Sequence, residues 1–185
     1  SKLNPAVRLI NLERNQGKGH AVKTGALATE GELILFADAD GATPIVELRR
    51  LEDGITAGAD LAIGSRAKKA EDTAVRTRLF LKIRGQTFNR IVNALLLPSI
   101  RDTQCGFKLF KRECARFCFE RQRSKGFSFD VEILYIAQQA GFAIAEIPIN
   151  WTNIPGSKVH PILDPFRMLR DVIWIWFIHR NAHLR

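Results

Sequence analysis

Several features that would classify a protein at once are scarce or missing in this sequence. No apolar run approaches the ~20 residues that span a bilayer, and no stretch predicts a signal peptide. The three cysteines, Cys105, Cys114 and Cys118, include no C-x-x-C pair, so we expect neither a zinc site nor a disulfide framework, and a reducing compartment is favoured. The Walker spacing G-x-x-x-x-G-K-[ST] is also missing, which argues against a P-loop nucleotide site.

Acidic residues are in the minority. The 185 residues contain 28 Lys and Arg against 19 Asp and Glu, a formal charge of +9 at neutral pH. This balance suits an anionic partner such as a nucleic acid, a phosphorylated substrate or an acidic membrane surface. With 46% hydrophobic and 25% charged residues, the composition is that of one globular domain. The chain begins with Ser1 and not with Met, so we expect an upstream piece to be absent.

The densest pattern is an apolar run that ends in two carboxylates, Leu33-Ile34-Leu35-Phe36-Ala37-Asp38-Ala39-Asp40-Gly41. The run predicts a buried strand over 33–37, and Asp40-Gly41 predicts a turn, so both acids follow the end of the strand. Ligands of open α/β sheets bind at that edge, and two carboxylates there could hold Mg²⁺ or Mn²⁺ beside substrate phosphates. The alternative is that Asp38 and Asp40 only cap a loop or the next helix.

A glycine-rich turn lies upstream of this strand. Residues 7–12 alternate in polarity and predict a short strand, 15–20 predicts a loop, and the apolar residues of 21–27 predict a helix. A glycine loop between a strand and a helix can present backbone N–H groups to a phosphate. The residues of this turn that we take as candidate nucleotide contacts are Gly17, Lys18 and Gly19.

Strands and helices then alternate along the chain. Thr43 is a candidate cap for a helix that begins at Pro44 and continues at helical spacing to Ile55. Residues 61–64 predict another strand. This alternation predicts an α/β fold with a parallel sheet.

Basic residues cluster after the strand at 61–64. From position 66 to 90 the sequence has eight basic residues against two acids, namely Arg66, Lys68, Lys69, Arg76, Arg78, Lys82, Arg84 and Arg90. A solvated helix face is the ordinary explanation of such a run. Arg66 differs, because it follows its strand much as Asp40 follows the strand at 33–37. Its guanidinium is therefore expected at the same sheet edge, where it could bind a phosphate bidentately.

Polar residues also interrupt two apolar regions further on. Residues 100–110 predict a site loop that enters a short strand, and 129–137 predicts a helix. Capping and compensation of the helix dipole account for Ser128 and Asp130 at the start of that helix. A strand follows at 142–149, and its internal proline indicates an edge position in the sheet.

The last segment, 165–185, predicts an amphipathic helix. Its apolar residues recur at spacings of three and four, 172–178 is apolar all round, and arginines flank that run. The run is too short to cross a bilayer, but tryptophans and arginines around an apolar band are typical of helices at the lipid interface. We expect contact with a membrane surface, and burial on the domain is the alternative.

Five motifs together resemble one enzyme family. They are Asp38-Ala39-Asp40-Gly41-Ala42-Thr43, Gly64-Ser65-Arg66, Arg101-Asp102-Thr103-Gln104-Cys105-Gly106-Phe107-Lys108-Leu109-Phe110, Phe129-Asp130-Val131-Glu132 and Asn150-Trp151-Thr152. In this order they are similar to the dolichyl-phosphate β-glucosyltransferases among the inverting family 2 glycosyltransferases, over nearly the whole chain. The resemblance implies a GT-A (Rossmann-like) fold, a mostly parallel sheet flanked by helices. It also implies that the family's first strand, its nucleotide-base motif and, in eukaryotes, an N-terminal membrane helix precede these residues.

The resemblance implies a reaction and a set of roles. Glucose would pass from UDP-glucose to dolichyl or another polyprenyl phosphate with inversion, giving a β-linked lipid donor for N-glycan assembly. Asp38 and Asp40 would hold Mg²⁺ or Mn²⁺ against the donor diphosphate, and Ala39 would lie near the nucleotide with the glycine turn. The catalytic candidates are Asp40 and two acids that could act as base or orient the acceptor, Asp102 first and Asp130 second.

The acceptor is itself a phosphate, which is mostly ionised at neutral pH because its second pKa is near ~6. A strong general base is therefore less necessary than for a sugar hydroxyl. The residues that the resemblance assigns to this phosphate are Arg66, Arg76, Arg78, Arg84, Ser157 and Lys158.

The implied organisation is a catalytic domain over 1–163 and a membrane-associated helix over 164–185. The location would be the cytosolic face of the endoplasmic reticulum membrane in a eukaryote, or the cytoplasmic face of the plasma membrane in a prokaryote. The same fold could instead use GDP-mannose or another nucleotide sugar, although the loop at 104–107 leans toward glucose. A basic nucleic-acid-binding module is the distant alternative, but the chain has one Tyr and its Phe residues lie in apolar runs.

Overall fold

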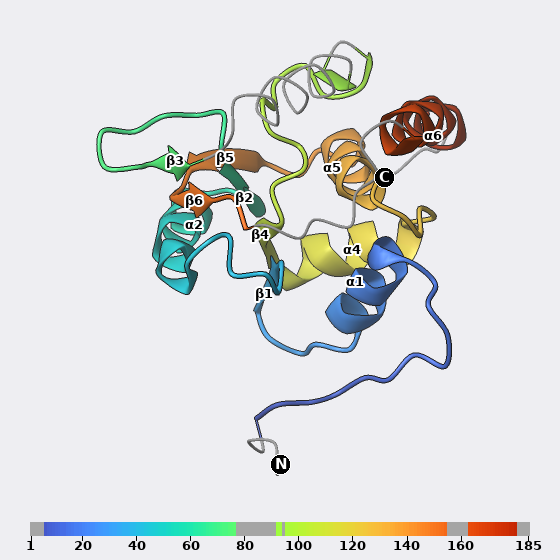
Figure 1. Cartoon of the computed structure of the whole chain (residues 1–185), viewed down its shortest axis with the longest axis horizontal. Coiled ribbons are helices and arrows are strands. Elements are labelled where there is room, and N and C mark those ends of the chain that lie inside the picture. Colours follow the sequence, from blue (N-terminus) through green and yellow to red (C-terminus); the bar gives the residue numbers. More distant parts are fainter. Residues whose placement is uncertain (1–5, 77–91, 94, 155–162, 181–185) are drawn as a thin grey trace.

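The fold is given by a computed structural model that describes residues 6–76, 92–93, 95–154 and 163–180, with only the backbone of 163–169 (Figure 1). The helices are α1 (Lys18–Leu27), the 3₁₀ turn η1 (Ile45–Glu47), α2 (Leu48–Thr56), α4 (Arg112–Arg121), α5 (Phe129–Gln139) and α6 (Leu163–His179). The strands are β1 (Leu33–Ala37), β2 (Leu61–Ser65), β3 (Val75–Arg76), β4 (Phe107–Lys111), β5 (Ile144–Pro148) and β6 (Trp151–Thr152).

The main sheet has the strand order β1-β4-β2-β5. Strands β1, β2 and β5 run in one direction, and β4 lies between β1 and β2 in the opposite direction. Because β4 is reversed, its first residue, Phe107, pairs with the last residue of β1, Ala37. The loop at 101–106 that enters β4 therefore lies at the same edge where β1 and β2 end.

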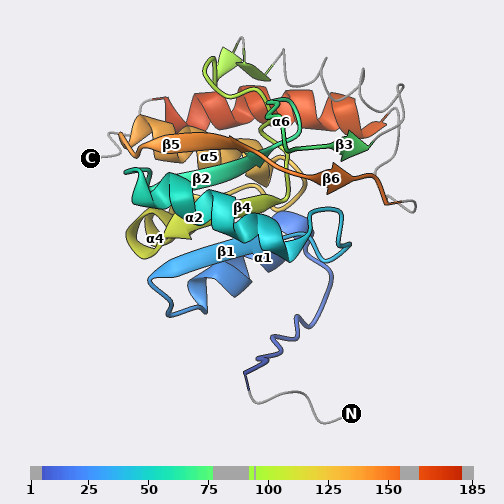
Figure 2. The ribbon, with the colours of Figure 1, turned by 90° about the vertical axis from the view of Figure 1, so that its left-hand side faces the viewer.

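Helices cover both faces of this sheet (Figure 2). On one face α2 packs against β2, β4 and β5. On the other face α1 packs against β1, α4 packs against β1 and β4, and α5 packs against α4. Alternation along β4 sends Phe107 and Leu109 into the core under α2 and Phe110 into the core under α4 and α5. Lys108 shares the parity of Phe110, so a charged side chain enters the larger core.

The predicted strands at 33–37, 61–64 and 142–149 and the helices at 21–27 and 129–137 are confirmed, and β5 does lie at a sheet edge. The strand predicted for 7–12 is wrong, because these residues are unpaired and mostly exposed, and a strand needs cross-strand hydrogen bonds. The predicted cap at Thr43 is also wrong. Pro44 occupies the N-cap of η1 and no side chain caps it, since the tight 3₁₀ turn begins one residue later.

Helix α6 packs outside α5 (Figure 1). Val172, Ile175 and His179 face the domain and are buried, while an exposed apolar face carries Ile173, Trp174, Trp176 and Phe177. Among the described helices, none combines the length and hydropathy needed to cross a membrane. The described side chains of the helix thus form one face that is buried on the domain and one apolar face that is exposed.

Candidate functional site

Arg66, directly after β2, is fixed by a bidentate pair with Asp102. Its Nε and Nη2 donate to Asp102 Oδ2 and Oδ1 at 2.7 and 2.8 Å, and its backbone N–H donates to Oδ2 at 2.9 Å. The guanidinium also lies 5.3 Å from the ring centroid of Trp151. Burial alone would raise the pKa of Asp102, but the Arg66 charge outweighs it and holds that pKa below its usual value. Asp102 therefore stays a carboxylate that orients Arg66.

A second carboxylate, Glu146 of β5, ties down the two loops that carry this pair. Its Oε1 accepts from Ser65 Oγ at 2.7 Å and from the Asp102 N–H at 2.8 Å, and its Oε2 accepts from the Arg101 N–H at 3.1 Å. Glu146 is 9% exposed, so these bonds are shielded from water. The end of β2 and the loop before β4 are held in register by one buried side chain.

The loop that carries Asp40 reaches the same region through β6. The Ala42 N–H donates to Asp40 Oδ1 at 2.9 Å, and the Ala42 carbonyl accepts from the Thr152 N–H at 2.9 Å. Trp151, the neighbour of Thr152, carries the ring that lies beside Arg66. Asp40 is exposed, and the bond to Ala42 uses only one of its oxygens. An open carboxylate and an oriented guanidinium thus flank the same short strand.

Asp38, at the end of β1, is enclosed on two sides. Its N–H donates to the Gly106 carbonyl at 2.8 Å, and its carboxylate lies so close to the Gly106 Cα that a Cβ there would collide with it. On the other side Lys18 Nζ, in the first turn of α1, lies 2.8 Å from Asp38 Oδ1. This ion pair joins the glycine turn to the acidic motif.

Lys108 and Asp130 form a buried ion pair, with 2.5 Å between Lys108 Nζ and Asp130 Oδ1. Lys108 is wholly buried and also donates to the Cys105 carbonyl at 2.6 Å. Burial raises the pKa of Asp130, and attraction to Lys108 and then to Lys18 offsets only part of that rise. The nearby Asp38 charge adds to the rise. Asp130 therefore binds a proton more readily than an ordinary aspartate.

The two glycines of the turn have a packing role. Gly17 precedes α1 with a φ of 96°, and a Cβ on it would collide with the Lys125 carbonyl. A Cβ on Gly19 would meet the Ser124 carbonyl at 2.6 Å and the Phe129 side chain at 2.7 Å. Close packing of α1 on the loop at 124–126 explains both residues, and their predicted contact with a nucleotide stays a prediction.

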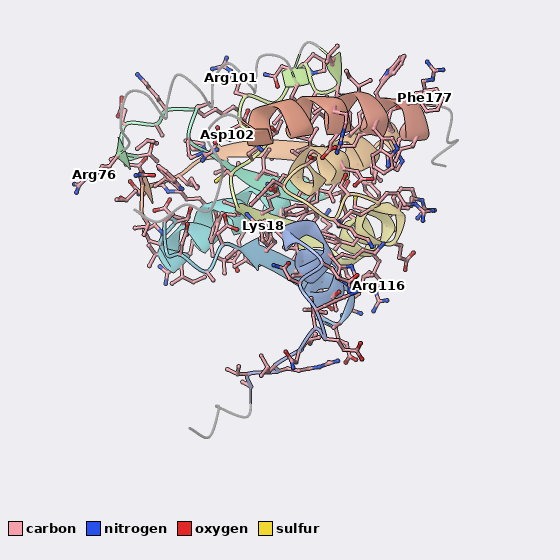
Figure 3. All side chains as sticks on the ribbon, turned by 45° about the vertical axis from the view of Figure 1, so that its right-hand side comes forward. Lys18, Arg76, Arg101, Asp102, Arg116 and Phe177 are labelled. Atoms are coloured by element: carbon pink, nitrogen blue, oxygen red, sulfur yellow. The ribbon has the colours of Figure 1, made fainter. Side chains whose placement is uncertain are left out.

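The other predicted residues fall outside this cluster or outside the described residues. Arg76 is exposed on β3, and its backbone carbonyl accepts from the Asn153 N–H at 2.9 Å. In Figure 3 its side chain lies at the outer margin, away from the labelled Asp102. Ala39 is exposed in the loop before Asp40. The candidates that lie outside the described residues are Arg78, Arg84, Ser157 and Lys158.

Sequence reasoning did not assign a role to Lys108, Glu146 or Ser65, which hold the site together. A usable signal existed for the two charged residues. Lys108 stands in an apolar strand and Glu146 in another, and a charge within a buried run must be paired. The partners could not be known before the sheet order brought β4 and β5 beside β2.

The donor groups of Asp40 and Asp38 fit a hard divalent cation, which takes carboxylate oxygens and shares its other positions with phosphates. No group of three or more His, Cys, Asp or Glu side chains in the described part of the chain could hold a metal by itself. Asp40 is exposed, whereas Asp38 is bound by Lys18. Asp40 is the better placed ligand, and substrate oxygens would have to complete the shell.

Comparison with known proteins gives a consistent family. The pattern of glycosyl transferase family 2 matches residues 1–119. The chain is 43% identical over 176 residues to a dolichyl-phosphate beta-glucosyltransferase of Dictyostelium discoideum and 42% identical over 178 residues to one of Homo sapiens. These matches cover 92% and 91% of this chain and 54% of each relative. The chain therefore spans about half the length of these curated relatives.

Solved structures show the same fold at low sequence identity. Glucosyl-3-phosphoglycerate synthase from Mycobacterium tuberculosis with Mn²⁺, UDP and phosphoglyceric acid has a TM-score of 0.63 and 19% identity, over 89% of this chain and 54% of that one. The complex with Mn²⁺, UDP-glucose and phosphoglyceric acid has a TM-score of 0.59 and 18% identity, over 88% and 54%. This likeness confirms the GT-A fold predicted from the motifs.

Proposed function

Because this chain belongs to glycosyl transferase family 2, we propose that it is the catalytic part of an enzyme that transfers glucose from UDP-glucose to dolichyl or another polyprenyl phosphate. The proposal is supported by the relatives described as dolichyl-phosphate beta-glucosyltransferases, which are 39 to 43% identical to this chain in Saccharomyces cerevisiae and Dictyostelium discoideum. The structural neighbour with Mn²⁺ and UDP-glucose supports a nucleotide-sugar donor and a divalent cation.

One observation carries the proposal. Strand β6 links the loop of the exposed Asp40 to Arg66, through the Thr152 bond to Ala42 and the Trp151 ring beside the guanidinium. This link supports a site in which Asp40 would hold a cation and Arg66 would bind a phosphate, as a reaction between a sugar diphosphate and a lipid phosphate requires.

In the proposed reaction, an oxygen of the acceptor phosphate attacks the anomeric carbon of glucose. The bond from that carbon to the UDP oxygen breaks on the opposite face, and its electron pair leaves with UDP, so the configuration inverts. A divalent cation supplies neutralisation of the diphosphate charge when bound, and Asp40 is the residue that would hold it, with Asp38 beside it. Arg66 keeps its bidentate face on Asp102, so it presents its remaining N–H groups and its charge to a phosphate.

Of the two candidate bases, Asp130 fits the role better than Asp102. Both oxygens of Asp102 accept bonds from Arg66, whereas the Lys108 bond to Asp130 uses Oδ1. The raised pKa of Asp130 also suits a group that accepts a proton. Since a phosphate acceptor is mostly ionised, we assign Asp130 the task of orienting the acceptor and taking a proton from its monoanion.

The exposed face of α6 supports contact of 164–185 with a membrane, next to a catalytic domain over 1–163. Trp174 and Trp176 are 43% and 42% exposed, and the Arg180 guanidinium lies 4.4 Å from the Trp176 ring centroid. Such a face suits the interface where a polyprenyl phosphate presents its headgroup. The eukaryotic relatives favour the endoplasmic reticulum membrane as the location.

The test is product formation by the complete protein. UDP-glucose, Mg²⁺ or Mn²⁺ and dolichyl phosphate should give a glucolipid, and GDP-mannose should not replace the donor. Asp40→Ala should abolish transfer while the circular dichroism spectrum stays unchanged. Transfer of mannose in place of glucose would overturn the donor assignment, and normal turnover by Asp40→Ala would overturn the metal-binding role.

A further inference from the structure

A cavity of about 400 Å³ lies between the loop at 123–125 and α6, and none of the carboxylates described above is among the described residues that line it. The described residues that line it are mainly basic and aromatic, and they are Arg123, Ser124, Lys125, Arg170, Asp171 and Trp174. The acid among them is already engaged. Asp171 Oδ2 accepts from Ser128 Oγ at 2.7 Å, and Asp171 Oδ1 lies 2.9 Å from Arg170 Nη2. The charge left over in the cavity is positive.

The cavity is built by a buried clamp. Glu132 of α5 is wholly buried, and it accepts from the Arg123 N–H at 2.9 Å and the Ser124 N–H at 2.6 Å. The same carboxylate lies 2.8 Å from His179 Nε2 of α6. The buried Glu132 side chain therefore fixes the loop at 123–125 and α6 relative to each other, and these two segments form the walls of the cavity.

The positive charge continues on the other side of the loop. A second cavity, of about 580 Å³, lies between this loop and α1. The described residues that line it include His20, Lys23, Arg123 and Lys125, and none of them is acidic. An anion that approaches the loop meets favourable potential from both sides.

An apolar surface adjoins the first cavity. Trp174 lines the cavity, and Ile173, Trp176 and Phe177 of α6 are 42 to 63% exposed. In Figure 3 Phe177 lies on the outer side of α6. A ligand that satisfies both parts must carry an anionic head and apolar chains, and a free anion would leave the apolar face uncovered.

We propose that the cavity between 123–125 and α6 binds the headgroup of an anionic phospholipid while the acyl chains lie against the exposed face of α6. This inference rests on the membrane contact in the proposed function and adds a specific lipid site to it. The Lys125 carbonyl accepts from the His20 N–H at 3.2 Å, so the lipid-binding loop is also the support of α1. Headgroup binding would therefore fix how α1 and its Lys18 are held relative to the bilayer.

The experiment measures binding of the complete protein to vesicles of phosphatidylcholine, with and without 20% phosphatidylserine. Arg123→Gln with Lys125→Gln should weaken binding to the anionic vesicles about 30-fold, since each basic residue near an anionic surface contributes on the order of 1 kcal/mol. Binding to pure phosphatidylcholine should change less than about twofold. The control is Arg49→Gln with Arg116→Gln, two exposed residues on α2 and α4, which removes equal charge and should leave the preference for anionic vesicles.

A competition measurement and an activity measurement separate the possible outcomes. Inorganic phosphate should not compete at millimolar concentration, and competition would identify a free anion as the ligand and overturn the proposal. If the loop variant and the control lose equal affinity for the anionic vesicles, the loss reflects net charge alone, and the proposal is also overturned. Glucosyl transfer to a short, water-soluble polyprenyl phosphate should be normal in the loop variant. If the wild-type protein does not carry out this transfer, the proposed function itself is contradicted.

Discussion

The buried pair of Lys108 and Asp130 leads to the sharpest prediction about stability. In Lys108→Met the Asp130 carboxylate, 3% exposed, loses its charged partner, and the Cys105 carbonyl loses a donor at 2.6 Å. Removal of one member of a buried pair costs about 3–5 kcal/mol. We expect a loss of that size in the free energy of unfolding at pH 7.

The loss should depend on pH in a defined direction. The folded pKa of Asp130 is already raised by burial, and it rises further without Lys108. A carboxyl group whose pKa is raised by folding binds its proton more tightly in the folded state. It therefore adds to the free energy of unfolding below the pKa of the unfolded chain, about 3.9, and this contribution is lost as the pH rises through the folded pKa. The loss of unfolding free energy in Lys108→Met should therefore grow as the pH rises above about 3.9. Adding Asp130→Leu should recover at least about 2 kcal/mol, because no unpaired charge remains.

Urea denaturation followed by circular dichroism measures these differences. The matched control is Lys111→Met on the same strand, whose side chain is 41% exposed and pairs at 3.0 Å with Asp60, itself 29% exposed. An exposed pair contributes about 0–1 kcal/mol, so the control should lose little. The reasoning would be refuted if Lys108→Met lost no more unfolding free energy than Lys111→Met, or if its loss did not change with pH.

Three further outcomes concern catalysis. Glu146→Gln puts an amide where the carboxylate accepts three hydrogen bonds. It should raise the KM for the lipid acceptor about tenfold or more and lower the free energy of unfolding by about 1–3 kcal/mol. An unchanged KM would make Glu146 purely structural. Arg66→Lys loses the fork that binds Asp102 and should weaken both phosphate-bearing substrates, and unchanged steady-state constants would contradict this. Asp130→Asn should remove the acidic limb of the pH–rate profile that the raised pKa predicts, and a limb that persists would exclude Asp130 as its source.

The sequence predicted the parts of the fold whose patterns are local. The apolar run before Asp38 and the helix after Ser128 needed only periodicity and turn residues. The reversal of β4 was not predicted, because the direction of a strand in a sheet depends on long-range pairing. The strand expected at 7–12 failed for a related reason, since alternation alone supplies no partner.

The candidate site was predictable in its composition more than in its connections. Motif positions identified Asp40, Arg66, Asp102 and Asp130. Asp130 lies in a buried ion pair, Arg66 and Asp102 form a partly buried one, and Asp40 lies in an exposed loop. The assignment of Asp102 as the first choice of base rested on resemblance. Its bonds to Arg66 could be seen only when the reversed strand brought the loop at 101–106 to the end of β2.

The central claim is that Asp40 holds a divalent cation against the diphosphate of the donor. Electron paramagnetic resonance of Mn²⁺ with the complete protein tests it directly, because free and bound Mn²⁺ give different signal amplitudes. The account predicts tight Mn²⁺ binding only when UDP-glucose is present, and at least a tenfold loss in Asp40→Asn but not in the exposed control Asp72→Asn. Equal Mn²⁺ binding by wild type and Asp40→Asn in the presence of UDP-glucose would contradict it.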